Sequence, residues 1–377
     1  MSTLRVNTIT NNGSAVDLPQ KFKIGGSNVE QGYTASGSEP SSPATGDFWW
    51  DSSNEKLYRY INGEFKELSI VAPSVNYGDR GFSFGDDGTV QPERIQYVSL
   101  TSAGNAADFG DLTVGGAESS ACSNGTTAFR MGGHNGSGTR QNVIEKWTAS
   151  TLGNGSDHGD LSAATNYSHG NSDATTGICV HGYTGSYSDT IDRFTMASAG
   201  NATDHGNLTY SRAYGGSGAS VSSARMLNFG GYGPGGTANY RDDCDYITIT
   251  TAGNAVDFGD LIEANHYCTG VGSGSGDRVL QLGGTENTGS GGYRSDRIQY
   301  FDLNTLGNAT DAGNLLTING EVAAGMNTAT HGFKAGGYGA SAVVNTIQRT
   351  DLATGGNATD WGDLLQASYD TTGTSGT

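Results

Sequence analysis

The ten residues Ala103–Leu112 read AGNAADFGDL, and five closely similar phrases follow along the 377-residue chain. They are LGNGSDHGDL from Leu152, AGNATDHGNL from Ala199, AGNAVDFGDL from Ala252, LGNATDAGNL from Leu306 and GGNATDWGDL from Gly355. Their first shared glycines stand at 104, 153, 200, 253, 307 and 356, so the steps are 49, 47, 53, 54 and 49 residues. A repeat of this length predicts one supersecondary unit per copy, with neighbouring units stacked on each other.

Each unit has the same apolar positions upstream of the repeated phrase. Nine residues before its glycine stand Ile95, Ile144, Ile191, Cys244, Ile298 and Ile347. Three residues further on stand Val98, Trp147, Phe194, Ile247, Phe301 and Thr350. Four units also carry an earlier glycine pair, at 132–133, 230–231, 283–284 and 336–337. Together with 61 glycines and only 15% charged residues, this pattern predicts four short antiparallel strands per unit and no helical protein.

The order of these features resembles kelch repeats, in which a double glycine ends the second strand of a blade and an aromatic residue lies in the third. The resemblance implies an all-β fold with a six-bladed kelch-like β-propeller over residues 71–377. The chain ends in ASYDTTGTSGT, which matches the first strand of a unit, whereas Asp79–Asp86 matches a second strand. We therefore expect the C-terminal strand to close the first blade, which would pair two otherwise open strand edges.

The charge of the chain limits its partners. It has 38 acidic and 20 basic residues, a formal net charge of -18 and a pI near 4.6, so binding to nucleic acid or to an anionic membrane is not expected. No apolar run is long enough to span a bilayer, and the start MSTLRVNTIT lacks the apolar core of a signal peptide. We expect a product made in the cytoplasm, without membrane insertion.

Few residues have a pattern that suggests chemistry. The four cysteines show no zinc or redox spacing and are interpreted as small buried hydrophobes. The aspartates of the repeated phrase leave two interpretations open, a calcium site or a tight hairpin turn with leucine packed under the next blade. The turn is favoured because the phrase offers too few clustered ligands. His158 and His205 occupy a variable slot of the outer strand. We predict no enzyme, no metal and no cofactor.

Residues 1–70 lie outside the repeat and read as short β-hairpins with a loop linker. Their main feature is PATGDFWWDSSNEKLYRYINGEF, with Trp49, Trp50, Leu57, Tyr58, Tyr60 and Phe65 around two hairpin-like turns. This segment and the start MSTLRVNTI resemble parts of tail-fibre and other virion proteins of marine bacteriophages, especially cyanophages. The resemblance implies a virion structural protein that attaches to other virion proteins through residues 1–70, often as a homotrimer.

Two functions follow from this resemblance. The first is a tail fibre or receptor-binding appendage, which displays the propeller for host attachment through a surface receptor, with carbohydrate as the expected class. The alternative is a head fibre, a capsid decoration protein or another structural assembly component.

The candidate host-contact residues come from the loops between second and third strands. From the double-glycine slot to the isoleucine column the spacings are 9, 11, 9, 13, 14 and 10 residues, so these loops vary in length. They are rich in tyrosine, glycine, serine and asparagine, and tyrosine offers sugars a flat face and a hydroxyl. The alternative is that they are only solvated turns. The predicted contacts are Tyr183, Tyr187, Tyr232, Tyr240, Tyr293 and Tyr338.

Overall fold

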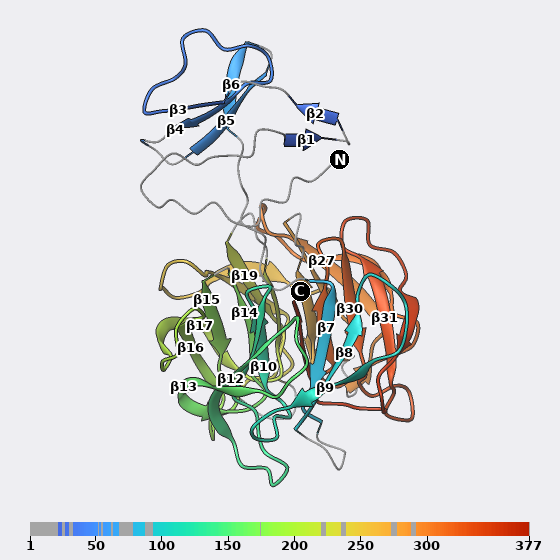
Figure 1. The fold of residues 1–377 in the computed structure, drawn as a ribbon. Coiled ribbons are helices and arrows are strands. Elements are labelled where there is room, and N and C mark those ends of the chain that lie inside the picture. Colours follow the sequence, from blue (N-terminus) through green and yellow to red (C-terminus); the bar gives the residue numbers. More distant parts are fainter. Residues whose placement is uncertain are drawn as a thin grey trace. The chain divides into compact units, whose positions relative to one another are not determined.

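The protein is described here by a computed structural model covering residues 22–24, 27–29, 33–51, 53, 56–61, 63–67, 78–86, 93–173, 175–219, 224–234, 239–272, 277–287 and 292–376. Contacts divide the chain into two compact units, Met1–Ala72 and Pro73–Thr377. Every regular element among the described residues is a β-strand, so the fold is all-β (Figure 1).

The described residues of the second unit form six four-stranded antiparallel sheets, one for each copy of the repeat. The first sheet holds β33 (Thr372–Gly376), β7 (Arg80–Phe84), β8 (Arg94–Ser99) and β9 (Ala107–Asp111). The second holds β10 (Ser120–Ser123), β11 (Thr127–Met131), β12 (Gln141–Thr148) and β13 (Ser156–Thr165), and the third β14 (His169–Ser172), β15 (Thr176–Val180), β16 (Ser188–Thr195) and β17 (Thr203–Arg212). The fourth holds β18 (Gly216–Ala219), β19 (Arg225–Phe229), β20 (Asp243–Thr248) and β21 (Val256–Asp260), and the fifth β23 (Thr269–Gly272), β24 (Arg278–Leu282), β27 (Arg297–Asp302) and β28 (Thr310–Asn314). The sixth holds β29 (Ala324–Asn327), β30 (His331–Ala335), β31 (Thr346–Asp351) and β32 (Thr359–Asp363).

The first strands of neighbouring sheets contact each other in a cyclic order. β10 contacts β14, and the contacts continue through β18, β23, β29 and β33 back to β10. The first strands therefore lie at the centre of the arrangement. The fifth unit adds a small sheet of β22 (Asn265–His266), β25 (Thr285–Asn287) and β26 (Gly292–Arg294). β25 and β26 come from the longest of the loops between second and third strands, and β22 comes from the segment that leads into β23.

The first unit contains a separate mixed sheet, in the order β3 (Tyr33–Ser36), β4 (Phe48–Asp51), β5 (Lys56–Ile61) and β6 (Glu64–Glu67), and a pair formed by β1 (Phe22–Ile24) and β2 (Ser27–Val29). β4, β5 and β6 pair antiparallel, as the two expected turns require. β3 pairs parallel to β4, which the sequence did not suggest. Trp49 is buried and stacks on Tyr58, with 4.8 Å between the ring centroids. The side chains of Trp50 and Leu57 and the start MSTLRVNTI lie outside the described residues.

The apolar columns of the repeat form the core between the sheets. The six residues of the isoleucine column are 0% exposed. Buried clusters join each sheet to the next; Phe82 and Phe84, for example, pack with Trp147 of the second sheet. A second cluster joins Val98 of the first sheet to Phe333 of the last. Each buried isoleucine contributes about 1.5–3 kcal/mol. The cysteines are buried within this core, as predicted.

The repeated phrase joins one sheet to the next. The backbone N–H groups of Gly153 and Gly155 donate to the carbonyl oxygens of Phe109 and Asp111, at 3.1 and 2.7 Å. In return the N–H of Asp111 donates to Oδ1 of Asn154, at 3.1 Å. The start of each phrase therefore covers the open edge of the preceding outer strand, which would otherwise leave backbone groups unpaired.

The glycine and asparagine that begin the phrase lie in the loop of an antiparallel hairpin, as expected, for example between β8 and β9, but their hydrogen-bond partners lie in the neighbouring unit. The closing leucine does pack as expected, since Leu112 joins the cluster between the first two sheets. His158 lies on the outer strand β13, as expected. It is buried between Phe129 and Phe194, and its Nε2 lies 3.0 Å from the carbonyl oxygen of Thr195.

The C-terminal segment supplies the first strand of the sheet that contains β7. β33 pairs antiparallel with β7, from Thr372 opposite Phe84 to Gly376 opposite Arg80. Figure 1 marks the C-terminus beside β7. This is the strand pairing expected from the unfinished last unit.

A second set of contacts between sheets uses a buried polar residue directly after the isoleucine column. The carboxylate of Glu145 accepts from the backbone N–H of Thr113, and Asp192 accepts from that of Ser162. At the junction of last and first sheets, Gln96 Oε1 accepts from the N–H of Leu365, at 2.9 Å. The full set of acceptors is Gln96, Glu145, Asp192, Asp245, Gln299 and Gln348. Burial of these side chains is tolerated because an oxygen of each accepts a backbone hydrogen bond.

Candidate functional site

Six residues at equivalent positions adopt the left-handed backbone conformation. They have φ between 52° and 63° and are Glu118, Tyr167, Tyr214, Tyr267, Glu321 and Asp370. Each stands fourteen residues after the glycine of its phrase and just before the first strand of a sheet. Non-glycine residues rarely take this conformation, so its appearance in every unit reflects a shared tight entry into the central strand. We call these six residues the central mouth.

The central mouth has an acidic half and an aromatic half. In cyclic order its three carboxylates, Glu321, Asp370 and Glu118, are followed by its three tyrosines. Backbone hydrogen bonds link neighbours, from Glu118 N–H to the oxygen of Asp370 at 3.0 Å and from Tyr267 N–H to that of Tyr214 at 2.8 Å. Carboxylates and phenol rings therefore surround one opening.

A small polar cavity lies directly behind the central mouth. Its volume is about 70 Å³, and it is lined by segments of all six sheets, each beginning with the residue that follows a member of the mouth. The lining carries the hydroxyls of Ser119, Ser168, Ser217 and Thr371 and the imidazole of His169. Burial lowers the pKa of His169 to about 3, so this ring is neutral near pH 7. Thr371 is 1% exposed, and its hydroxyl makes no hydrogen bond.

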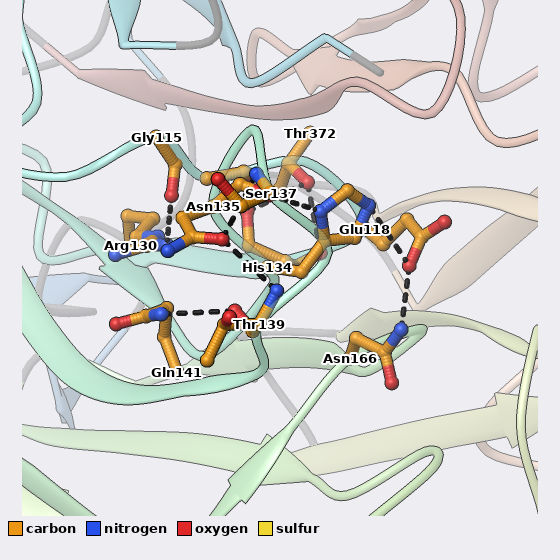
Figure 2. Close-up of polar contacts among 12 residues, drawn as sticks. Gly115, Glu118, Arg130, His134, Asn135, Ser137, Thr139, Gln141, Asn166 and Thr372 are labelled. Carbon is orange, nitrogen blue, oxygen red and sulfur yellow. Dashed lines mark hydrogen bonds and ion pairs between the residues drawn. The ribbon is translucent and has the colours of Figure 1, made fainter.

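Glu118 is held in place at the edge of this opening. Its Oε2 accepts a 2.7 Å hydrogen bond from Nδ2 of Asn166 and lies 3.4 Å from Nε2 of His134 (Figure 2). The adjoining loop is ordered by Asn135, whose Oδ1 accepts from the backbone N–H groups of Ser137 and Thr139 (Figure 2). The loop from His134 therefore positions a carboxylate of the mouth.

Aromatic rings extend from the central mouth into the loops between second and third strands. Tyr167 and Tyr214 lie 3.9 Å apart between ring centroids, and Tyr214 and Tyr267 lie 5.0 Å apart. The ring centroid of His266 lies 4.4 Å from that of Tyr267 and 4.4 Å from that of Tyr240. His266 therefore connects the mouth to the outer loops.

The structure brings four of the predicted contact residues into one aromatic series. Between ring centroids, Tyr183 lies 5.7 Å from Tyr187, Tyr187 lies 5.9 Å from Tyr232, and Tyr232 lies 5.8 Å from Tyr240. All four are half-buried, so they are packed residues of a formed surface and not freely solvated side chains.

The other two predicted residues lie in the corresponding loops of the fifth and sixth sheets. Tyr293, on β26, is 47% exposed. The guanidinium of its neighbour Arg294 stacks on the ring of Tyr338, 4.2 Å from the centroid. We call the six predicted tyrosines together with the aromatic half of the mouth the tyrosine-rich face.

The tyrosine phenols of the mouth have raised pKa values. Burial raises the pKa of Tyr214 to about 12, and the carboxylates of Glu118 and Asp370 add to the increase. Burial also raises the pKa of Tyr267, with a further increase from Glu321, Asp370 and Glu118. The phenols are therefore neutral near pH 7.

The tyrosines and carboxylates of the mouth were missed by the sequence reasoning, although a signal for them exists. Extending the alignment to fourteen residues after the glycine gives a column of Glu, Tyr, Tyr, Tyr, Glu and Asp. What that column could not reveal is that its members face one opening.

The described residues hold no group of three or more His, Cys, Asp or Glu side chains arranged to bind a metal ion. Nor does any helix in the described part of the chain have the length and apolarity to cross a membrane.

The arrangement can bind a ligand by ring stacking, hydrogen bonds to hydroxyls and carboxylates, and charge. The chain matches no protein-family model, and the search of curated proteins found no matching sequence.

Proposed function

We propose that residues 71–377 form a six-bladed kelch-like β-propeller and that the protein is a structural component of a bacteriophage particle that displays this propeller for recognition of the host surface. The cyclic contacts of the six first strands support the propeller. So does the junction of last and first sheets, where the N–H groups of Gly104 and Ala106 donate to the oxygens of Trp361 and Asp363, at 2.9 and 2.8 Å. The C-terminal strand then closes the first blade.

The observation that carries the recognition role is the tyrosine-rich face. In a four-stranded blade the loops between second and third strands and the entries to the first strands emerge on one side, so tyrosines from several units share a surface. Tyrosine presents a rigid ring and a hydroxyl at a low cost in side-chain entropy, which suits sugar rings. A carbohydrate receptor on the host is therefore the proposed partner, and binding without catalysis is the proposed activity.

The attachment role is proposed for residues 1–70, on the resemblance of GDFWWDSSNEKLYRYINGEF to virion segments. In this proposal the first unit joins other virion proteins, with a homotrimer as the expected assembly, and the particle is where the protein resides. Deletion of residues 1–70 should abolish incorporation into particles while the remaining chain stays folded as a monomer.

The recognition role is tested by replacing Tyr232, Tyr240 and Tyr293 together with alanine. Binding of the full-length protein to cells of the host bacterium should fall at least about tenfold, since each lost stacking contact contributes about 0.5–1.5 kcal/mol. The matched control replaces Tyr97, Tyr246 and Tyr300, half-buried tyrosines on third strands that stack with Arg80, Arg225 and Arg278. Equal binding by both variants would contradict the proposal.

Antibody labelling of intact particles distinguishes the two structural roles. Label on the tail supports the host-attachment appendage, whereas label on the capsid supports a head fibre or decoration protein.

A further inference from the structure

We infer that the central mouth recognises a neutral hexose, with the sugar ring on the tyrosines and its exocyclic hydroxymethyl group inserted into the cavity behind them. This inference rests on the proposed carbohydrate recognition and adds the chemical class of the ligand. It follows from unpaired hydroxyl groups in the cavity wall, from the charged groups around the cavity and from its size.

Most hydroxyl groups in the cavity wall are already committed to the protein backbone. Those that donate to a backbone carbonyl oxygen belong to Ser119, Ser120, Ser217, Thr269 and Thr372. Thr371 differs, because its hydroxyl is buried in the same wall and makes no hydrogen bond. The buried hydroxyl of Ser168 also lacks a hydrogen bond of normal geometry, and the Cys179 thiol near it is a weak partner. Two hydroxyls of the wall are therefore available to a ligand.

A hydroxyl group is the ligand group that this wall fits. It donates one hydrogen bond and accepts others, so it can pair with Thr371 and Ser168, each of which also donates and accepts. The neutral imidazole of His169 lines the same cavity and has one donor and one acceptor nitrogen. Buried polar groups are almost always paired, because an unpaired one loses its interaction with water and gains nothing in return. A methyl group in the cavity would leave the Thr371 hydroxyl unpaired.

The charged groups around the cavity favour a neutral substituent. The oxygen of Thr269 in the wall already accepts a 2.9 Å hydrogen bond from the Lys334 amine, so an amine on the ligand would lose this acceptor and would lie near a second amine. On the side of the mouth, the carboxylates of Glu118 and Asp370 directly precede wall residues in sequence and would repel the carboxylate of an acidic sugar. A hydroxyl group meets neither obstacle.

The size of the cavity selects the part of the sugar that enters. A volume of about 70 Å³ is less than half of the roughly 150 Å³ that holds a benzene ring. A sugar ring therefore stays outside, whereas a hydroxymethyl group, which has one carbon and one oxygen, fits within. Tyr167, Tyr214 and Tyr267 lie beside the cavity as one continuous aromatic surface, on which the C–H face of the sugar ring can pack.

The test measures the dissociation constants of methyl glycosides for the full-length protein by saturation-transfer NMR titration at pH 7. The probes are the glycosides of glucose, galactose and mannose, each paired with its 6-deoxy counterpart, in which a methyl group replaces the hydroxymethyl group. At least one hexose should bind at least about tenfold more tightly than its 6-deoxy counterpart, because a site built to pair with a hydroxyl rejects the analogue that lacks it. The uronic acid of that hexose should bind no more tightly than the 6-deoxy form.

Two substitutions locate the effect. Thr371→Val keeps the shape of the side chain and removes its hydroxyl, and Ser168→Ala removes the other unpaired hydroxyl. Each should reduce the preference for the hexose at least about threefold. Thr371→Val should leave the melting temperature unchanged, since it removes no hydrogen bond of the free protein. Thr350→Val is the matched control, because it removes the hydroxyl of a buried threonine on β31, outside the cavity wall, and should leave the preference unchanged.

The outcomes separate this inference from the proposed function. If no hexose of the panel binds, or if each binds like its 6-deoxy counterpart, the hydroxymethyl assignment is wrong, whereas loss of cell binding in the tyrosine variant would still support carbohydrate recognition. If the preference is present but survives both Thr371→Val and Ser168→Ala, the hydroxymethyl group does not enter this cavity and the central mouth is not the site.

Discussion

The backbone N–H of Asp363 donates a 3.1 Å hydrogen bond to Oδ1 of Asn105, a residue 258 positions earlier in the chain. The same bond joins Asp111 to Asn154 and Asn207 to Asn254, between units that follow each other in sequence. The junction between the last and first sheets is therefore made in the same way as the internal junctions, although the chain does not run through it.

The first prediction tests this equivalence. Asn105→Ala should lower the free energy of unfolding by about 1 kcal/mol, the net value of one such hydrogen bond. Asn254→Ala, at an internal junction, is the matched control and should cost a similar amount. Urea unfolding followed by circular dichroism measures both values. A cost for Asn254→Ala with none for Asn105→Ala would mean that the last and first sheets are not joined in solution.

The second prediction concerns the glycine within the repeated phrase. Gly206 has φ of 148°, and a Cβ atom placed on it would lie 2.4 Å from the carbonyl oxygen of Gly253 in the next unit. Gly206→Ala should destabilise the protein by about 2 kcal/mol or more, because strained backbone and a clash combine. Gly200→Ala is the control, since a Cβ there meets no atom within 4 Å. The two melting temperatures provide the measurement, and equal values would contradict the close approach.

The third prediction concerns the C-terminal strand. Deletion of residues 366–377 removes β33 and leaves one edge of β7 unpaired, next to the buried rings of Phe82 and Phe84. The loss should amount to several kcal/mol, a large part of the stability of an ordinary domain. Calorimetry of the truncated protein should show a markedly lower melting temperature. A truncated protein that melts like the intact one would show that this strand contributes little.

The fourth prediction concerns pH and Lys334. Its amine is fully buried and donates to Thr269 Oγ1 and to the carbonyl oxygen of Leu282, at 2.9 and 3.2 Å. Burial lowers the pKa of Lys334 to about 7 from an ordinary value of 10.5. Between pH 7 and about 10.5 the Lys334 amine is therefore protonated in the unfolded chain but largely neutral in the folded one. This group makes the free energy of unfolding rise with pH over that range.

Lys334→Met removes that titration. The difference in unfolding free energy between wild type and variant should therefore shift in favour of wild type as pH rises from 6.5 to 8.5. Comparing the two proteins at each pH cancels the contributions of other groups, such as the buried thiol of Cys179, whose pKa burial raises to about 12. A constant difference across this range would contradict the shifted pKa.

Much of the candidate surface could be predicted from loop composition, because glycine, serine and tyrosine between two strands mark an exposed, adaptable loop whatever the fold. Tyr183, Tyr187, Tyr232 and Tyr240 were found in this way, and they lie together. Tyr167, Tyr214 and Tyr267 were not, since a single tyrosine before a short strand resembles an ordinary core residue.

The sequence by itself determined the number of units, the strands within each and the buried column from Ile95 to Ile347, because strand alternation and turn residues act over a few positions. Only the tertiary structure decided which residues of different units contact each other. The Asn154 side chain finds its partner in the preceding sheet, and Glu118, Tyr214 and Asp370 meet around one opening although they are far apart in sequence. Such contacts depend on the angle between neighbouring sheets, which arises from the packing of side chains such as Trp147 and Phe84 and is not encoded by any one segment.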